Sequence, residues 1–380
     1  MSSLQNPSIV LYGPGDARFE DRPAPRITDP MDAIIRIKYV GSYSAGVLQT
    51  RLSLTSSHVL LLPQVHFWNH GGIANKVVTP EHPLTMGHEA SGTIHAVGSG
   101  VTHLRPGDNV AIEPGRPCRA CVRCKEGNYN LCPDMAFAAC TAPKTHGCLS
   151  KYFKIPADFC YKLPPDVHLS EGVLAEPLAV AAHAVRAVKI SYGSTLVVFG
   201  SGTIGLLCGA VARLFGAKTV VLVDVQESKL EFACGFIHGV GTYLPKETVS
   251  VDEHAATIIE EFGLGAGADA VIEATGAETC IQTGVHVLRS GGSYVQTGLG
   301  KPIVNFPIVA MSEKEIHMHG AFRYGPGDYQ VAMNVLEARS IPVRDLVSKT
   351  FEFERATEAW EATKQGRGIK NMIRGYGYRE

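Results

Sequence analysis

Alternation of apolar and polar positions divides the chain into three regions. Residues 1 to about 165 contain short runs with a period of two, separated by glycine and proline, which predicts short antiparallel strands. Residues from about 170 to 310 alternate apolar strands with helix-period segments, which is typical of βαβ units and a parallel sheet. The remaining residues are mixed, with helices predicted near Tyr329–Arg339 and Glu354–Lys364. The clearest runs of the first region are Ala33–Ile37, Gly92–Val97 and Asn109–Ile112.

Length and charge narrow the class of protein. A chain of 380 residues predicts two domains, since a domain usually holds roughly 100–200 residues. Hydrophobic residues at 45% and charged residues at 19% are ordinary for a globular enzyme and exclude a disordered chain. The 35 basic and 36 acidic side chains give a net charge of −1, so no electrostatic feature favours nucleic acid or an anionic membrane as a partner.

No segment predicts secretion or membrane insertion. Met1–Asp16 lacks the basic segment and apolar core of a secretory signal. The uncharged stretch Ile190–Ala212 has glycines grouped around Gly200–Gly205, which predicts a buried strand, a turn and the start of a helix. The uncharged stretch Leu52–Trp68 is interrupted by proline and two histidines, so neither stretch predicts a transmembrane helix. We therefore expect a cytoplasmic protein with reduced cysteines.

A glycine-rich turn between a strand and a helix predicts a dinucleotide site. The strand Thr195–Phe199 is followed by Gly200-Ser201-Gly202-Thr203-Ile204-Gly205 and by an apolar helix from about Thr203 to Phe215. Gly200 allows the tight turn, Gly202 lets the pyrophosphate approach the backbone, and Gly205 lets helix and strand pack closely. Free N–H groups at the helix N-terminus favour the phosphates.

Asp224 follows the second strand of this pattern, Thr219–Val223. Its carboxylate would accept hydrogen bonds from the adenosine ribose hydroxyls and repel a 2′-phosphate, which predicts NAD rather than NADP. A surface acid at a strand end is the alternative interpretation of Asp224. Strand, glycines, helix, second strand and acid together are a much stronger signal than the glycines alone.

Four cysteines share one short loop, Cys118-x2-Cys121-x2-Cys124-x7-Cys132. Four thiolates suit a tetrahedral zinc with no open position, which is a structural site. An iron–sulfur cluster could use the same thiolates, but the sequence indicates no redox partners for one, and free thiols are the third alternative. The other cysteines are expected to pack in apolar surroundings: Cys140, Cys148, Cys160, Cys208, Cys234 and Cys280.

Several motifs together resemble the zinc-containing medium-chain alcohol dehydrogenases, and within them the polyol branch of sorbitol dehydrogenases and fungal xylitol dehydrogenases (D-xylulose reductases). The resemblance extends over nearly the whole chain. The motifs that carry it are Gly87-His88-Glu89, the four-cysteine loop, Ala175-Glu176-Pro177-Leu178, the glycine-rich turn with Asp224, and Phe322-Arg323-Tyr324. The runs most similar to the xylitol enzymes are Met135–Ala139, Asp158–Pro164 and Arg323–Tyr329.

The resemblance implies an α/β protein with two domains. A GroES-like, mainly antiparallel β catalytic domain would occupy residues 1–167 and contain the structural zinc loop. A Rossmann domain with a doubly wound parallel sheet would occupy residues 168–309 and bind NAD. Residues 310–380 would return to the catalytic domain.

The resemblance also implies the residues of the active site. His88 and Glu89 become ligands of a catalytic zinc, and Glu176 orders the zinc-bound water and the substrate. The zinc would lower the pKa of the alcohol, and hydride would pass from the resulting alkoxide to C4 of the nicotinamide. The side chains expected to contact polyol hydroxyls are Phe67, Glu176, Arg323 and Tyr324. The residues expected to contact NAD are Gly200, Gly202, Ile204, Gly205, Asp224, Lys229, Thr297, Gly298, Leu299, Phe322 and Arg323.

Residues 42–64 depart from the family pattern. The family has G-I-C-G-S-D-V-H-[YF]-W, in which the Cys is a zinc ligand and the Ser lies on the proton path. Here Gly41 leads into Ser42–Gln64 before Val65-His66-Phe67-Trp68 resumes the pattern, and no cysteine precedes Cys118. The segment is either translated intron in place of a short exon or a genuine insertion, in which His58 or His66 could approach the metal. We expect it to misplace Phe67 and Trp68.

Two functions from different classes follow. The first is an NAD- and zinc-dependent polyol dehydrogenase that oxidises xylitol to D-xylulose, with sorbitol and then L-arabinitol as less favoured substrates. The second is an NAD-binding protein with a structural zinc and impaired turnover, because the cysteine ligand of the catalytic zinc is missing. The expected partners are a small polyol and further copies of the chain in a dimer or tetramer.

Overall fold

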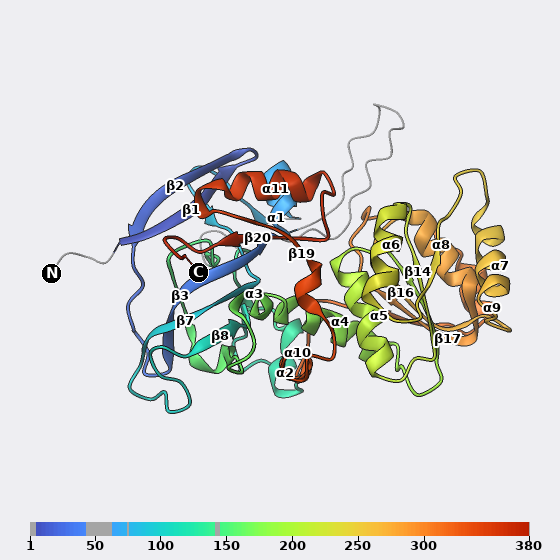
Figure 1. Cartoon of the computed structure of the whole chain (residues 1–380), viewed down its shortest axis with the longest axis horizontal. Helices are drawn as coiled ribbons and strands as arrows, with labels where there is room; N and C mark the ends of the chain where they lie inside the picture. Colours follow the sequence, from blue (N-terminus) through green and yellow to red (C-terminus); the bar gives the residue numbers. More distant parts are fainter. Residues whose placement is uncertain (1–4, 43–62, 74–75, 141–144, 380) are drawn as a thin grey trace. The chain divides into compact units, whose positions relative to one another are not determined.

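The computed structural model describes residues 5–42, 63–73, 76–140 and 145–379, which fall into two compact units (Figure 1). The first unit comprises the described parts of residues 1–44, 62–176 and 325–380, and the second comprises Pro177–Tyr324. The family resemblance implied boundaries at 167/168 and 309/310, whereas these units divide at 176/177 and 324/325. The second boundary lies later because residues 317–320 still pair in the sheet of the second unit.

A mainly antiparallel sheet of seven strands forms the body of the first unit within the described residues. Its order is β12-β8-β7-β3-β20-β19, with β11 also paired to β3. Only β19 and β20 run parallel among these pairs. The three strands predicted in this region are therefore confirmed. The bounds are β3 Asp32–Ser42, β7 Ala90–Val97, β8 Asn109–Ile112, β11 Tyr152–Pro156, β12 Cys160–Lys162, β19 Val347–Phe351 and β20 Lys370–Arg374.

Smaller elements surround this sheet. The β1–β2 hairpin, in which Ile9 lies opposite Phe19, joins β6 in a three-stranded sheet. The predicted C-terminal helices are confirmed as α10 and α11. The strands are β1 Gln5–Gly13, β2 Asp16–Pro23, β4 Gly72–Ile73, β5 Lys76–Val77, β6 Leu84–Thr85, β9 Gly115–Arg116 and β10 Ala136–Phe137. The helices are α1 Pro63–His70, α2 Val122–Lys125, η1 Tyr129–Leu131, η2 Ala157–Phe159, α3 Leu169–Gly172, α10 Asp328–Ala338, η3 Val343–Leu346, η4 Phe353–Arg355 and α11 Ala356–Lys364.

The second unit is built on a parallel sheet of six strands in the order β15-β14-β13-β16-β17-β18. Every pair in it is parallel, as the predicted βαβ units require. Helices α5, α6 and α8 lie against its strands (Figure 1). The strands are β13 Thr195–Phe199, β14 Thr219–Val223, β15 Gly241–Tyr243, β16 Ala268–Glu273, β17 Leu288–Gln296 and β18 His317–Gly320. The helices are α4 Ala175–Ala187, whose first two residues belong to the first unit, α5 Thr203–Leu214, α6 Glu227–Phe236, α7 Val251–Glu261, α8 Glu278–Val287 and α9 Ile308–Glu313.

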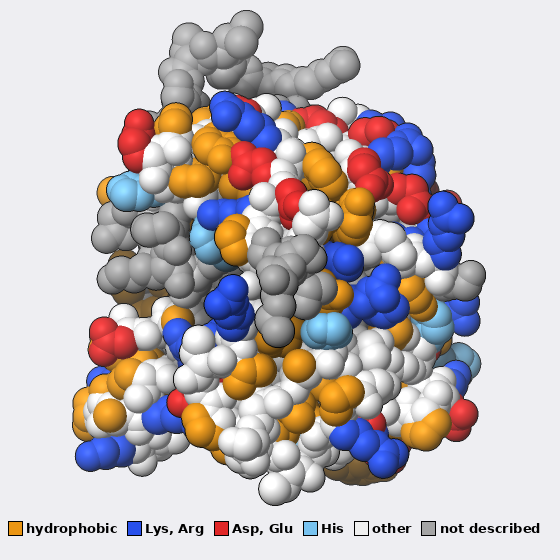
Figure 2. All heavy atoms as spheres, turned by 90° about the vertical axis from the view of Figure 1, so that its left-hand side faces the viewer, with side chains coloured by type: hydrophobic (Ala, Val, Ile, Leu, Met, Phe, Trp, Pro, Cys, Tyr) orange, Lys and Arg blue, Asp and Glu red, His pale blue; other side chains and the backbone are white. Residues whose placement is uncertain are grey.

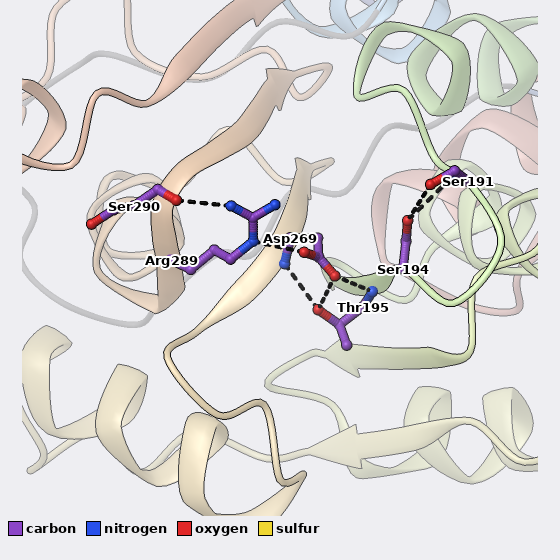
Figure 3. A network of polar contacts seen from close by, with 6 residues as sticks. All are labelled: Ser191, Ser194, Thr195, Asp269, Arg289 and Ser290. Carbon is purple, nitrogen blue, oxygen red and sulfur yellow. Dashed lines mark hydrogen bonds and ion pairs between the residues drawn. The ribbon is translucent and has the colours of Figure 1, made fainter.

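The order of the strands reverses direction between β13 and β16. A ligand of an open parallel sheet binds outside the carboxyl ends of the strands at this point of reversal. The amino ends are tied together by Asp269, whose Oδ2 accepts from the Thr195 backbone N–H at 2.8 Å and whose Oδ1 accepts from Arg289 Nε at 2.7 Å (Figure 3). The carboxyl ends form the opposite edge of the sheet, where this rule places a ligand.

Helix lengths and surface charge agree with the composition. None of the helices that the structure describes has both the length and the apolar character needed to cross a bilayer. Basic and acidic side chains are interspersed over the face shown in Figure 2. Of the six scattered cysteines, four are buried as predicted, namely Cys140, Cys148, Cys160 and Cys208. Cys280 is half-buried, and Cys234 is exposed because it lies on the outer side of α6.

Candidate functional site

The glycine-rich turn has the geometry that the sequence predicted. Gly200 has φ +101°, in the left-handed region that favours glycine, and it turns the chain from β13 into α5. A Cβ on Gly205 would lie 1.7 Å from the Gly200 carbonyl oxygen, so only glycine lets the helix approach the turn this closely. A Cβ on Gly202, the N-cap of α5, would meet no atom within 4 Å, so the backbone is open to a ligand there.

Asp224 lies at the carboxyl end of β14 and holds the turn. Its Oδ2 accepts from the Ser201 backbone N–H at 2.7 Å, and its Oδ1 accepts from the Gln226 backbone N–H at 2.9 Å. Each carboxylate oxygen can accept more than one hydrogen bond, so the half-buried group keeps capacity for ribose hydroxyls. The side chain therefore both fixes the turn and presents a negative charge at the edge of the sheet.

The other predicted NAD contacts lie in the same unit. Ile204 is buried in the first turn of α5, and Lys229 is half-buried on α6. Thr297, Gly298 and Leu299 follow β17 directly, at the carboxyl edge. Phe322 is 49% exposed, and the Arg323 guanidinium lies 4.6 Å from its ring centroid. The carboxyl edge thus combines the turn, Asp224 and the segment after β17; contact of each residue with NAD stays a prediction.

The four cysteines of the loop form a compact cluster. Their Sγ atoms all lie within 4.8 Å of one another, with Cys121 and Cys124 at 3.5 Å and Cys121 and Cys132 at 3.9 Å. Zinc–sulfur bonds of about 2.3 Å in a tetrahedron need sulfur–sulfur separations of about 3.8 Å. Backbone N–H groups of Ala120 and Cys121 lower the pKa of the Cys118 thiol to about 7, which favours the thiolate that a metal binds. The cluster therefore fits a structural zinc.

A buried carboxylate connects this loop to the body of the first unit. Glu113, at the end of β8, accepts from the Tyr129 hydroxyl at 2.8 Å and from the Tyr161 hydroxyl at 2.9 Å. Tyr129 lies between Cys124 and Cys132, so its hydrogen bond fixes the loop from inside. Burial raises the pKa of Glu113 to about 7, although both tyrosine hydroxyls act to lower it.

His88 and Glu89 stand where β7 begins, and both are buried. Gly87, with φ +92°, makes the turn before them, and a Cβ there would lie 2.7 Å from Val40 Cγ1. Both Glu89 oxygens accept from Lys370 Nζ, at 2.6 and 2.5 Å, and this ion pair is 1% exposed or less. Gly41 packs directly on it, since a Cβ there would lie 2.0 Å from Glu89 Oε2.

The described residues do not by themselves complete a catalytic zinc site. Such a site ordinarily takes three protein ligands and a water. Among the residues that the structure describes, only the four-cysteine cluster brings three or more potential ligand atoms close enough to share an ion. Glu89 is instead bound through both oxygens by Lys370. His58 lies outside the described residues, and so does the side chain of His66.

The predicted substrate residues belong to different units. Glu176 is buried in the first turn of α4 within the first unit, whereas Arg323 and the buried Tyr324 belong to the second. Phe67, on α1, is 1% exposed and packs in the core of the first unit. Beside it, Trp68 Nε1 donates to Glu361 Oε1 at 2.7 Å. These substrate contacts and the expected misplacement of Phe67 and Trp68 stay predictions.

Among the buried charged residues that the sequence did not single out are Glu113, Glu273 and Lys370. Glu113 follows the apolar run Val110–Ile112, and Glu273 follows the apolar run Ala270–Ile272. Lys370 is the first residue of the buried strand β20. A charge at the end of a buried strand is the one signal that the sequence carried for them. Their hydrogen-bonding partners are visible only in the folded chain.

Comparison with known proteins agrees with this geometry. Residues 29–165 match the family described as "Alcohol dehydrogenase GroES-like domain", and residues 203–338 match "Zinc-binding dehydrogenase". The chain is 46% identical to a probable D-xylulose reductase A of Aspergillus terreus, over 98% of this chain and 99% of that protein. It is 45% identical to D-xylulose reductase A of Aspergillus oryzae, over 98% of each. Among solved structures, an Escherichia coli oxidoreductase/dehydrogenase of unknown specificity covers 98% of this chain and 99% of its own, at 28% identity and a TM-score of 0.85.

Replacing Cys121 with serine should remove the structural zinc. Protein purified without chelator should carry about one tightly held zinc in this cluster, and Cys121→Ser should carry almost none there, because a closed four-thiolate site loses its tetrahedron. We expect the melting temperature to fall by roughly 10 °C, as for a loss of about 3 kcal/mol. Metal analysis and calorimetry measure both, with Cys234→Ser, an exposed thiol of the other unit, as control. A Cys121→Ser protein with unchanged metal content and melting temperature would refute the assignment.

Replacing Glu113 with glutamine should change how stability depends on pH. The pKa of Glu113 is about 7 in the folded chain and 4.5 ordinarily, so ionisation of this group costs the wild type stability as pH rises from 4.5 to 7. The glutamine variant lacks that loss, which corresponds to about 3 kcal/mol above pH 7. Unfolding in denaturant at pH 5 and pH 8 should show the variant gaining on the wild type at pH 8, while the exposed control Glu354→Gln does not. A constant difference between variant and wild type would contradict the raised pKa.

Proposed function

The chain belongs to the zinc-binding medium-chain alcohol dehydrogenases, and from this membership we propose that it is an NAD-linked polyol dehydrogenase that interconverts xylitol and D-xylulose. The substrate follows from the similarity of nearly the whole chain to fungal proteins named D-xylulose reductase. Oxidation transfers a hydride from the carbinol carbon to C4 of the nicotinamide, while the hydroxyl proton leaves, so that NAD is reduced as the alcohol becomes a ketone.

The observation that carries this proposal is the carboxyl edge of the parallel sheet. The glycine turn, the open backbone at Gly202 and the Asp224 carboxylate stand together at the point where the strand order reverses. That combination suits a pyrophosphate at the start of α5 and a ribose at Asp224. Like-charge repulsion between Asp224 and a 2′-phosphate favours NAD over NADP.

We assign the substrate-side roles by family membership. Glu176, Arg323, Tyr324 and Phe67 would contact polyol hydroxyls, and His88 with Glu89 would be two of the ligands of a catalytic zinc. Zinc supplies Lewis-acid polarisation of the alcohol oxygen when it is bound. The described residues offer no third ligand beside His88 and Glu89, and Lys370 holds both oxygens of Glu89.

A second candidate function rests on that same ion pair. With Glu89 neutralised by Lys370 and no cysteine before Cys118, the chain suits an NAD-binding protein with one structural zinc and little turnover. The two candidates differ in metal content and in polyol oxidation, both of which can be measured on the same preparation.

The proposal also includes an oligomeric state and a cellular compartment. Strand β18 is the edge of its sheet, all of its residues are exposed, and Ile308 and Val309 nearby are 57% and 65% exposed. An open strand edge beside exposed apolar side chains favours pairing with another copy, so we propose a homo-oligomer. A loop of four thiols suited to zinc fits a reducing compartment such as the cytoplasm.

Removing the charge of Asp224 should relax the choice of cofactor. Titration calorimetry of the wild type should show NAD bound at least about ten-fold more tightly than NADP, an energy difference of about 1.4 kcal/mol. Asp224→Asn should narrow that ratio by about ten-fold, because the 2′-phosphate no longer meets a like charge. Asp252→Asn, an exposed acid of the same unit, is the control and should leave the ratio unchanged. Equal affinity of the wild type for both cofactors would refute the role of Asp224.

Replacing residues 42–64 by Ile-Cys-Gly-Ser-Asp should distinguish the two candidate functions. If the segment stands in place of the family sequence, the chain as written should hold less than a second zinc equivalent and oxidise xylitol very slowly. The replacement should bring a second zinc and NAD-linked xylitol oxidation, because it supplies the third ligand. Ile-Ser-Gly-Ser-Asp is the matched control, equal in length without the thiol, and should do neither. Ordinary turnover with two zincs in the unmodified chain would show that the segment is a functional insertion.

A further inference from the structure

Glu273 stands at the centre of the edge where the dinucleotide is proposed to bind. It is the last residue of β16, it lies opposite Phe199 at the end of β13, and its side chain is 0% exposed. Strands β13 and β16 are the pair between which the strand order reverses. The buried carboxylate therefore lies under the point where a ligand would cross from one half of the sheet to the other.

The carboxylate is held by donors from the loop after β16 and from the end of β17. Its Oε1 accepts from the Thr275 backbone N–H at 2.7 Å and from the Thr275 hydroxyl, and its Oε2 accepts from the Gly276 backbone N–H at 2.8 Å. From the neighbouring strand β17, Gln296 Nε2 donates to Oε2 at 2.6 Å. Burial raises the pKa of Glu273, and these donors oppose that rise. The side chain thus joins the loop after β16 to the end of β17.

The backbone of the same residue extends this link. The Glu273 carbonyl oxygen accepts from the backbone N–H groups of Thr297 and Gly298, both at 2.8 Å. Gln296 Nε2 also donates to the Gly298 carbonyl oxygen at 2.7 Å. Side chain and backbone of Glu273 together therefore set the position of residues 297–298, the first two after β17.

The loops after β16 and β17 are in close backbone contact. A Cβ on Gly298 would lie 2.4 Å from the Gly276 nitrogen and 2.6 Å from Glu273 Oε2, and a Cβ on Gly300 would lie 1.9 Å from the Gly276 carbonyl oxygen. No side chain fits between the loops at these positions. Their separation is accordingly fixed by backbone contact and by the hydrogen bonds to Glu273.

We propose that Glu273 is a positioning residue for NAD, which holds the loops after β16 and β17 at the spacing that receives the nicotinamide half of the cofactor. The proposal rests on the proposed NAD binding. A dinucleotide fold has two mononucleotide-binding halves. Asp224 and the adenosine ribose belong to the β13–β15 half, so the loops after β16 and β17 are left for the nicotinamide mononucleotide. Glu273 itself is buried and acts through Thr297 and Gly298.

The test separates the two halves of the cofactor. Glu273→Gln preserves the shape of the side chain but replaces one acceptor by an NH2 group, which cannot accept from the loop N–H groups. In the full chain purified with its zinc, calorimetric titration should show NAD affinity about ten-fold lower than in the wild type. Affinity for AMP, which needs only the β13–β15 half, should be unchanged. Glu278→Gln, a half-buried acid of the same unit that also accepts a side-chain hydrogen bond, is the matched control and should alter neither.

Gln296→Leu provides a second variant if Glu273→Gln does not fold. It removes the donor between Glu273 and Gly298 without touching the carboxylate, and it should lower NAD affinity about three-fold with AMP affinity unchanged. Equal losses of affinity for NAD and AMP would overturn the positioning role, because a general loss of structure in the unit weakens both ligands alike. Unchanged affinity for both ligands would overturn it as well. Absence of NAD binding by the wild type would overturn the proposed function and this inference together.

Discussion

A carboxylate that folding removes from water must recover its lost hydration from the protein, and this constraint governs three functional points of the chain. Glu89 is satisfied by a lysine, Glu113 by two tyrosine hydroxyls, and Glu273 by backbone and amide N–H groups. Each stands at an end of a strand, where the regular ladder stops and a loop begins. Burial of each carboxylate is costly, and the hydrogen bonds that offset this cost also hold the adjacent loop in place.

The three solutions have different chemical consequences. The tyrosines around Glu113 hold the four-cysteine loop on the sheet, so the structural zinc site is anchored to the body of its unit. Donors from the loop after β16 and from the end of β17 surround Glu273 and set the edge where the cofactor is proposed to lie. Lys370 neutralises the charge of Glu89 and binds both of its oxygens. This carboxylate is therefore paired with a lysine rather than with a metal. A buried ion pair that loses one partner is strongly destabilising.

The local geometry agrees with family membership at the dinucleotide edge and at the cysteine cluster, but it disagrees with it at Glu89. The family resemblance predicts a zinc bound by His88, Glu89 and a cysteine, while the chain has no cysteine before Cys118. Gly41, the last family-like residue before the unusual segment, packs directly on the Glu89 carboxylate. The departure in sequence therefore begins beside the group on which the proposed activity depends.

Local sequence determined the strand–turn–helix at Gly200, the parallel sheet and the four-cysteine loop, because their chemistry is encoded in short spacings and in the apolar period. Only the tertiary structure decided that Lys370 binds Glu89, from which it is 281 residues distant, and that Glu273 joins two loops. A buried charge finds its partner through packing of distant strands, and no local pattern records which strand that will be.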